Sequence, residues 1–249
     1  MASYTQAFNI LKKHPNETDF TKDNQLLTGE NIESVYRSLV NLNPQDKEVR
    51  ASLTEHLYAQ LEYFLKAKNW EAADRKTYQL MLNIVKREEP RHLGYDDINR
   101  FSCPNLQRID KLWVSNSDKR FGFSVQKEIW ISTKSRLGIK LSDLTDKDYE
   151  NYLRFARAVG RYDDKLEDST SRSRGGFVSY AEYVKRIKEN PEVGRGGVPY
   201  YYSYSYIDTL RKLETWQPKV LGSLVAGDFR GLWGSLEEQV LSRVATCRL

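Results

Sequence analysis

The stretch VRASLTEHLYAQLEYFLKAKNWEAADRKTYQLMLNI, residues 49–84, decides the fold class of this 249-residue chain. In its first half leucine recurs at every fourth position, which places the leucines on one helical face. These leucines are Leu53, Leu57, Leu61 and Leu65. A second helix is predicted from Asn69, a favoured N-cap residue. Because only residues 66–68 separate the two patterns, the helices must lie antiparallel as a helical hairpin.

Helical spacing continues after this hairpin, and convincing strands are few. One helix is predicted from Asn105 and another after Ser124. Three later helix starts carry a capping box, in which a hydroxyl and an acid three residues further on satisfy backbone N–H groups reciprocally. The boxes are Thr145 with Asp148, Ser179 with Glu182, and Ser235 with Glu238. The first of these helices should end at Gly160. The sequence therefore predicts an all-α fold, a helical bundle with extended loops.

The helical spacing of apolar residues weakens at two places in the chain. Residues 1–45 are weakly patterned, and we expect an N-terminal extension with one helix near Ile32–Leu42. Residues 46–249 then form the main all-helical domain. Within it, Ser169–Gly176 is small, polar and basic, and it is predicted to be a mobile loop.

Composition excludes several classes of protein. Apolar residues make up 39% of the chain, enough for a core, and no apolar run approaches the roughly 20 residues that a membrane helix needs. The start has neither a basic nor an apolar region of an export signal. The net charge of +5 suits an acidic ligand or partner without demanding nucleic acid. Cys103 and Cys247 lie far apart in the sequence, so we expect no disulfide framework and a reducing compartment.

Local motifs for catalysis are missing from the sequence. It contains no phosphate-binding loop, no dinucleotide-binding glycine fingerprint and no His-Glu-x-x-His pair. The histidines His14, His56 and His92 stand apart, and only His56 falls on a clearly predicted helix. The sequence therefore favours a binding protein over an enzyme.

Two aromatic segments are candidates for binding. Tyrosines cluster after Arg195 and the Gly196-Gly197 pair, where rings could bind single-stranded nucleic acid, a pigment or a protein, or could pack on the helical body. They are Tyr200, Tyr201, Tyr202, Tyr204 and Tyr206. The other segment is Phe121-Gly122-Phe123, which sets two rings in a predicted loop. Such rings either plug the core or form an apolar ligand surface, and the residues alone do not choose between these.

Residues Tyr58 to Trp130 resemble the genomes-uncoupled-four family, tetrapyrrole-binding regulators of magnesium chelatase in chlorophyll-making organisms. The resemblance rests on the ordered pieces LExFL at 61–65, WEAAD at 70–74, DIxxFxCP at 97–104, IDxLWV at 109–114 and RFGFSVQKxIW at 120–130. Beyond Trp130 it thins to shorter pieces, which are Tyr152–Gly160, Ser179-Tyr180 and Arg195–Pro199.

The resemblance implies an all-helical, hand-like core that holds one face of a porphyrin between the Phe-Gly-Phe-Ser loop and the Arg195–Pro199 loop. Apolar side chains would contact the macrocycle, and an arginine would meet a propionate. The implied cofactor-binding residues are Phe121, Phe123, Val125, Val159, Arg161 and Arg195. The implied ligand is protoporphyrin, its magnesium form or a bilin, bound non-covalently.

Departures from the family pattern leave other ligands open, including none. Arg161 stands where the family has tryptophan, and Gly197 and Val198 replace histidine and leucine. The segment Asp163–Gly176 looks like an insertion, and Leu210–Val225 has no clear counterpart. Cys103 could link a bilin covalently, but a small buried residue is the favoured interpretation of this position.

The resemblance further implies a non-enzymatic protein that acts on the large subunit of magnesium chelatase, in a cyanobacterial cytoplasm or a plastid stroma or at the periphery of the thylakoid membrane. The alternative is a repurposed scaffold that assembles a photosynthetic complex. Such a scaffold would dock phycobiliproteins or a thylakoid complex through basic residues such as Arg172 and Arg174. A bilin carrier or lyase is the third hypothesis.

Overall fold

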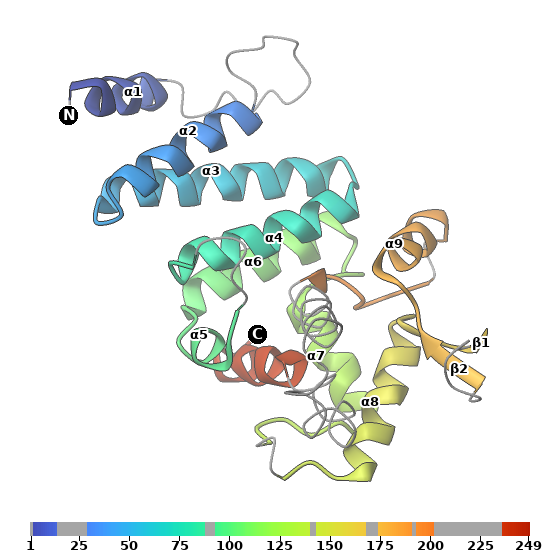
Figure 1. Cartoon of the computed structure of the whole chain (residues 1–249). Coiled ribbons are helices and arrows are strands. Elements are labelled where there is room, and N and C mark those ends of the chain that lie inside the picture. Colours follow the sequence, from blue (N-terminus) through green and yellow to red (C-terminus); the bar gives the residue numbers. More distant parts are fainter. Residues whose placement is uncertain are drawn as a thin grey trace, which may run out of the picture. The chain divides into compact units, whose positions relative to one another are not determined.

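A computed structural model of the chain describes residues 2–13, 29–87, 93–139, 143–167, 174–190, 193–201 and 236–249. Its described elements are helices apart from one two-stranded sheet (Figure 1), which confirms the all-α class. The chain divides into two compact units, Met1–Glu89 and Pro90–Leu249. The domain boundary expected near residue 45 therefore falls inside the first unit.

The helical hairpin of the first unit is formed by α3 (Lys47–Lys66) and α4 (Trp70–Ile84), which lie side by side and antiparallel (Figure 1). The four recurring leucines of α3 are buried. The side chain of Asn69 accepts a hydrogen bond of 3.2 Å from the Ala72 N–H, as expected of an N-cap. Periodicity and capping thus confirm the predicted hairpin.

The first 45 residues contribute more structure than their pattern indicated. They form α1 (Ala2–Lys13) and α2 (Gly29–Leu42), and α2 packs on α3. The helix predicted near Ile32–Leu42 is confirmed, whereas α1 was not predicted. Apolar side chains of both helices are buried, namely Phe8, Ile32, Tyr36, Leu39 and Val40.

An ion pair joins α2 to α4. Glu33 accepts a hydrogen bond of 2.6 Å from Lys76 Nζ and one of 2.8 Å from Arg37 Nε. Burial disfavours the charged form of Glu33, but the charges and hydrogen bonds of Lys76 and Arg37 outweigh it and lower the pKa of this carboxyl. The ion pair therefore adds to the apolar packing of α2 only while Glu33 is ionised.

The second unit contains α5 (Tyr95–Asn99), α6 (Cys103–Asn116), α7 (Phe123–Ser132), α8 (Asp146–Ala158) and α9 (Tyr180–Glu189). Residues 236–246 form a further helix, which we call the closing helix. The predicted starts at Asn105 and Ser124 are close to the observed ones. A core cluster joins α7, α8 and the closing helix; it comprises Val125, Ile129, Trp130, Tyr152, Phe155, Val159 and Leu241.

The predicted capping boxes have different outcomes. Thr145 and Asp148 form the expected box at the start of α8, and a hydrogen bond from Arg136 helps to hold the pKa of Asp148 well below its usual range. Ser179 Oγ accepts from the Glu182 N–H at 3.2 Å. Ser235 lies outside the described residues, so its box with Glu238 stays a prediction. Glu238 accepts from the N–H groups of residues 138 and 139.

A β-hairpin corrects part of the predicted loop. Strands β1 (Tyr162–Glu167) and β2 (Arg174–Phe177) pair antiparallel, so residues 174–176 belong to a strand. The strands have no alternating apolar pattern, and for this reason the sequence did not predict them. The ring of Tyr162 holds the pair together by an edge-to-face contact with Phe177, with centroids 5.2 Å apart.

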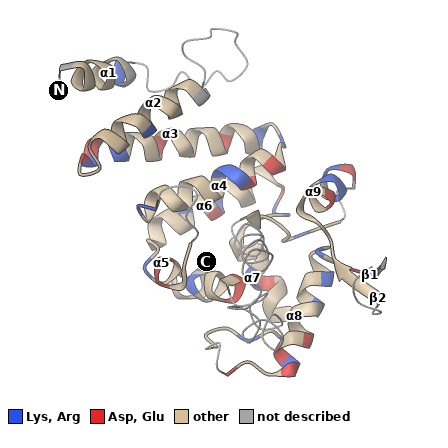
Figure 2. Cartoon of the chain, in the orientation of Figure 1, with Lys and Arg blue, Asp and Glu red and all other residues tan. Residues whose placement is uncertain are grey.

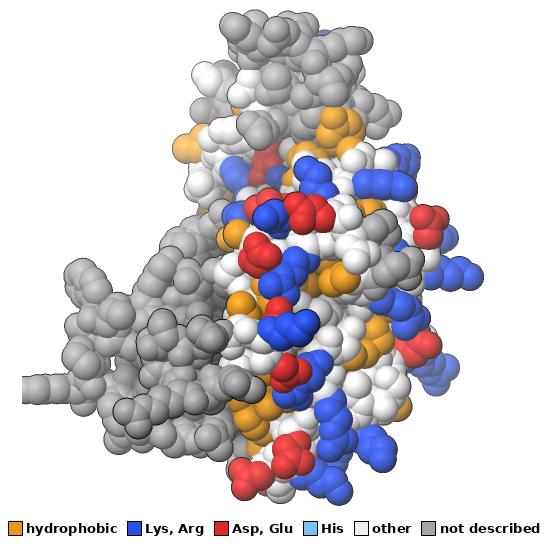
Figure 3. Space-filling model, turned by 90° about the vertical axis from the view of Figure 1, so that its right-hand side faces the viewer, with side chains coloured by type: hydrophobic (Ala, Val, Ile, Leu, Met, Phe, Trp, Pro, Cys, Tyr) orange, Lys and Arg blue, Asp and Glu red, His pale blue; other side chains and the backbone are white. Residues whose placement is uncertain are grey.

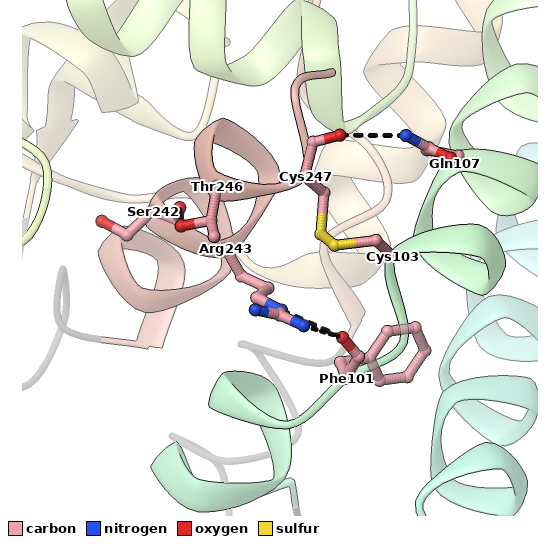
Figure 4. Close-up of a disulfide and its surroundings, with 7 residues drawn as sticks. All are labelled: Phe101, Cys103, Gln107, Ser242, Arg243, Thr246 and Cys247. Carbon is pink, nitrogen blue, oxygen red and sulfur yellow. Dashed lines mark hydrogen bonds between the residues drawn. A yellow bond between two sulfur atoms is a disulfide. The ribbon is translucent and has the colours of Figure 1, made fainter.

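The two cysteines overturn the expectation of free thiols. Cys103 and Cys247 form a disulfide, with their Cα atoms 5.2 Å apart (Figure 4). This spacing lies within the usual range for disulfides. Separation along the sequence gave no measure of distance in space, because α6 and the closing helix meet only in the tertiary structure.

The surface mixes charges of both signs. Acidic and basic residues both occur along the helices in Figure 2, and on the face shown in Figure 3 they interleave with small apolar patches. On that face, the described side chains do not gather the net charge of +5 into one basic stripe. Among the described helices, none has the length and apolar composition of a membrane-spanning segment.

The Glu33 ion pair predicts an acid-sensitive first unit. Replacing Glu33 by Gln should lower the free energy of unfolding by about 2 kcal/mol at pH 7. Because the folded pKa lies below the unfolded value of about 4.3, the carboxylate's contribution is complete above that value and is lost as the pH falls through the folded pKa. The difference between E33Q and the parent should therefore shrink below about pH 4.

Urea unfolding followed by far-UV circular dichroism at pH 7 and at low pH measures this difference. The matched control is Glu62→Gln, since Glu62 pairs with Lys66 on the exposed side of α3. E62Q should change stability by less than about 0.5 kcal/mol. A loss in E33Q that is equal at both pH values would contradict the ionic role of Glu33.

Candidate functional site

The candidate site is built from two loops of the second unit that are hydrogen-bonded to each other. We call residues 117–122, between α6 and α7, the aromatic loop, and residues 193–200, after α9, the glycine loop. The Gly122 N–H donates to the Val198 carbonyl at 3.1 Å, and the Gly196 N–H donates to the Arg120 carbonyl at 2.7 Å. The structure thus brings together the two loops that the resemblance pointed to.

Side chains add to this pairing. The amide of Gln126, in the first turn of α7, donates to the Pro199 carbonyl at 2.8 Å in a buried position. The Arg120 guanidinium donates to the Val193 carbonyl at 3.3 Å. Direct hydrogen bonds at these distances leave no space for a flat ring between the bonded stretches.

Glycine is required at two positions of the pair. Gly122 has a φ of 133°, and a Cβ there would lie 2.8 Å from Val114 Cγ2. A Cβ on Gly197 would lie 1.3 Å from the hydroxyl oxygen of Tyr183. The close approach of Tyr183 thus explains why position 197 is glycine in this chain.

Asp110 of α6 caps the start of α7. Gly122 precedes the helix and has no side chain to accept from its first N–H groups. Asp110 Oδ1 accepts instead from the Ser124 N–H at 2.8 Å. Burial raises the pKa of Asp110 although hydrogen bonds from residues 123 and 124 oppose this. The sequence pattern did not predict this role, although Asp110 is part of the quoted IDxLWV motif.

The ring of Phe121 in the aromatic loop and the ring of Phe123 at the start of α7 plug the core. Phe121 and Phe123 are fully buried, and the Trp113 ring meets Phe121 edge-to-face with centroids 6.2 Å apart. Val125 and Val159 belong to the core cluster shared by α7, α8 and the closing helix. Of the two roles that the sequence left open for the Phe121 and Phe123 rings, the structure therefore shows core packing. Like Val125 and Val159, these rings lie beneath the loop surface.

Arg161 is buried and joins three segments. It follows α8, and its Nε and Nη2 donate to the Gly197 carbonyl at 3.2 and 2.7 Å. Its Nη1 pairs with Glu237 of the closing helix, and the guanidinium lies 3.7 Å from the centroid of the Tyr200 ring. Both charged side chains of this pair are almost inaccessible to solvent. Arg161 thus supports the glycine loop from inside the protein.

Arg195 is the candidate that faces solvent. Its side chain is 50% exposed and pairs with Glu128 of α7 at 2.7 Å. Ser124, Glu128 and Ile131 follow one another at helical spacing, and Ile131 is 53% exposed. Arg195 therefore stands beside an accessible face of α7 that carries an apolar side chain.

The remaining candidate residues, the tyrosine cluster and the histidines, add little to the site. Tyr200 is buried against Tyr180 and Tyr183, so this part of the tyrosine cluster packs on the protein body. Tyr202, Tyr204, Tyr206, His14, His92 and Arg172 lie outside the described residues. His56 is buried beside the Tyr36 ring. Within the described ranges, no group of three or more His, Cys, Asp or Glu side chains could hold a metal ion.

Half of the chain matches a known family. A profile of the family described as GUN4-like matches residues 51–175, half of the chain. The chain therefore belongs to the GUN4-like family, and the resemblance stated from residues 58–130 is confirmed.

Three curated relatives share parts of the chain. The "Tetrapyrrole-binding protein, chloroplastic" of Arabidopsis thaliana is 36% identical over 86 residues, which are 32% of this chain and 31% of the relative. The "Uncharacterized protein ycf53" of Porphyra purpurea is 35% identical over 77 residues, 30% of this chain and 32% of the relative. The protein of the same name from Pyropia yezoensis is 32% identical over 110 residues, 43% of this chain and 46% of the relative.

The chain thus spans less than half of the length of these relatives. Among solved structures, ligand-free Arabidopsis thaliana GUN4 matches with a TM-score of 0.41 and 24% identity, over 57% of this chain and 80% of that chain.

The capping role of Asp110 predicts a difference between two substitutions. Asp110→Ala removes the acceptor for the first N–H groups of α7 and should lower the free energy of unfolding by about 1 to 2 kcal/mol. Asp110→Asn keeps an acceptor oxygen and has no charge to desolvate, so it should retain or raise stability at pH 7. Thermal unfolding of the two variants and the parent measures the difference. Equal losses in D110A and D110N would refute the cap.

The Arg161–Glu237 pair predicts partial rescue by a double substitution. Arg161→Met alone leaves Glu237 charged and buried, and should cost about 3 to 5 kcal/mol. The double variant Arg161→Met, Glu237→Leu removes both charges and should recover most of this loss. Urea unfolding followed by tryptophan fluorescence tests the coupling. Additive losses in the double variant would show that the two residues do not act as a pair.

Proposed function

We propose that this chain binds a tetrapyrrole non-covalently on the outer surface of the paired loops. The observation that supports this most directly is the position of Arg195, which the glycine loop holds beside the accessible face of α7 with Glu128 and Ile131. The family supports the ligand class, and the Arabidopsis relative carries tetrapyrrole binding in its name.

The chemistry of this surface suits an amphiphilic macrocycle. Apolar contact is worth roughly 25 cal/mol for each Å² removed from water, whereas an exposed ion pair contributes about 0 to 1 kcal/mol. Contact with Ile131 and the loop backbone would therefore set affinity, and Arg195 would orient a propionate. In this proposal Phe121, Phe123, Val125 and Val159 support the surface from below, and Arg161 positions the glycine loop.

The ligand is a porphyrin, its magnesium form or a bilin. Non-covalent binding is supported by the disulfide, because both cysteines of the sequence are engaged in it and neither offers a thiol to a bilin. We further propose that the protein is a non-enzymatic regulator of magnesium chelatase that acts on its large subunit. Family membership supports this partner, and the plastid relatives support a plastid stroma or cyanobacterial cytoplasm.

A pigment titration of the whole chain tests the proposal. Protoporphyrin, magnesium protoporphyrin and a bilin are each titrated, with tryptophan quenching and the absorption shift of the pigment as readouts. We expect saturable binding of at least one pigment. The absence of saturation with all three would overturn tetrapyrrole binding. Stimulation of purified magnesium chelatase by the pigment-loaded protein would test the proposed partner.

Charge reversal tests whether Arg195 takes part in pigment binding. Arg195→Glu should weaken binding by up to about fivefold, the equivalent of about 1 kcal/mol. The control is Arg154→Glu on α8, because Arg154 has a similar exposure and also faces a glutamate, Glu150. R154E should bind like the parent. Equal affinities for R195E and R154E would remove Arg195 from the site.

A further inference from the structure

The disulfide between Cys103 and Cys247 ties the closing helix to the start of α6. Cys103 is the first residue of α6 and is partly exposed, whereas Cys247 directly follows the closing helix and is buried. Figure 4 shows the bond beside two polar contacts between the same segments. The Gln107 amide donates to the Cys247 carbonyl at 2.9 Å, and Arg243 donates to the Phe101 carbonyl at 2.9 and 2.7 Å.

The other end of the closing helix reaches the candidate site. Glu237, near its start, pairs with Arg161, whose guanidinium holds the Gly197 carbonyl of the glycine loop. Between the two ends, Leu241 packs in the core cluster with Val125 and Val159. One short helix therefore connects the disulfide to the loop that carries Arg195.

The closing helix depends on these ties for its order. Over its described residues, 236–246, the closing helix is shorter than the roughly 12 to 15 residues that an isolated helix needs to persist in water. The disulfide closes a chain segment of 144 residues, and a crosslink across so long a segment strongly limits the freedom of the unfolded chain. Breaking the bond therefore weakens the closing helix more than the loss of one surface contact would.

We propose that Cys103–Cys247 is a reversible thiol–disulfide site, and that its oxidised form holds the closing helix and the glycine loop in the binding arrangement. The effect on pigment binding rests on the proposed function, whereas the effect on the closing helix does not. The reductant is a dithiol, such as the two thiols of a Cys-x-x-Cys motif in an oxidoreductase. Reduction loosens the glycine loop and lowers tetrapyrrole affinity.

The exchange balances as a two-electron reduction. A thiolate of the dithiol attacks the sulfur of Cys103, the more exposed of the two cysteines, and forms a mixed disulfide. The sulfur of Cys247 leaves as a thiolate and takes up a proton. The second thiol of the dithiol then attacks the dithiol sulfur that is bonded to Cys103. This breaks the mixed disulfide and releases Cys103 as a thiol. The dithiol becomes a disulfide, and the protein gains two thiols.

Hydrogen exchange read by mass spectrometry tests the first part of the proposal. The whole chain is compared in its air-oxidised form, after reduction by dithiothreitol, and as the variant Cys103→Ser, Cys247→Ser. Thiol titration first establishes the bond, and two free thiols in the air-oxidised protein would overturn the proposal. We expect reduction to speed exchange in residues 236–249 and 193–201, and reoxidation to reverse it. Peptides of α3 and α4 serve as the internal control and should not change.

The outcomes separate this proposal from the proposed function. Unchanged exchange in residues 236–249 after reduction would overturn the control of the closing helix. Faster exchange there without a change in residues 193–201 would overturn the link to the glycine loop. Protoporphyrin titration of the oxidised and reduced protein should show a several-fold weaker affinity after reduction, and equal affinities would overturn that effect. If no pigment binds in either state, the proposed function fails while the exchange result still decides the redox site.

Discussion

The buried ion pair between Arg161 and Glu237 is the contact on which the second unit depends most. Ionised groups are tolerated inside a protein only when they are paired and hydrogen-bonded. Arg161 meets this condition through two other segments at once, because it pairs with the closing helix and, in the glycine loop, donates to the Gly197 carbonyl and lies on the Tyr200 ring. If one segment moved, charge would be left buried without a partner. The end of α8, the glycine loop and the closing helix are therefore positioned together.

Because of this constraint, several candidate binding residues have structural roles inside the second unit. A cation at position 161 would repel or bind a ligand if it were exposed, but here the protein itself occupies its hydrogen-bonding groups. The rings of Phe121 and Phe123 are likewise used inside the core, where they support the aromatic loop. The proposed ligand surface is therefore the outer one, beside Arg195 and α7. A surface held by a packed core and a buried ion pair is preorganised, which reduces the entropy that binding has to offset.

The covalent and the ionic tie lie at opposite ends of one short helix. The disulfide holds the closing helix to α6, and Glu237 holds it to Arg161. Neither tie is local in sequence, and the core cluster around Leu241 lies between them. This arrangement couples the chemical state of two cysteines to the position of a loop to which neither cysteine belongs.

The sequence by itself determined the helices whose signals are local. The leucine spacing of α3, the N-cap of α4 and the capping box of α8 act over three or four residues, and each was confirmed. The motif around Phe121-Gly122-Phe123 also identified the family, because an ordered set of residue types is a property of the sequence alone. The β-hairpin escaped prediction because its strands lack an alternating apolar pattern, and α1 was not predicted although its residues have helical spacing.

Only the tertiary structure decided the rest of the site. That Cys103 meets Cys247, that Arg161 is buried against Glu237, and that the two loops are hydrogen-bonded all depend on distances between residues far apart in the chain. Such distances follow from how the whole unit packs around its core, and no spacing within the sequence encodes them locally. For the same reason, the sequence could not show that the rings of Phe121 and Phe123 belong to the core, and only their burial in the structure did.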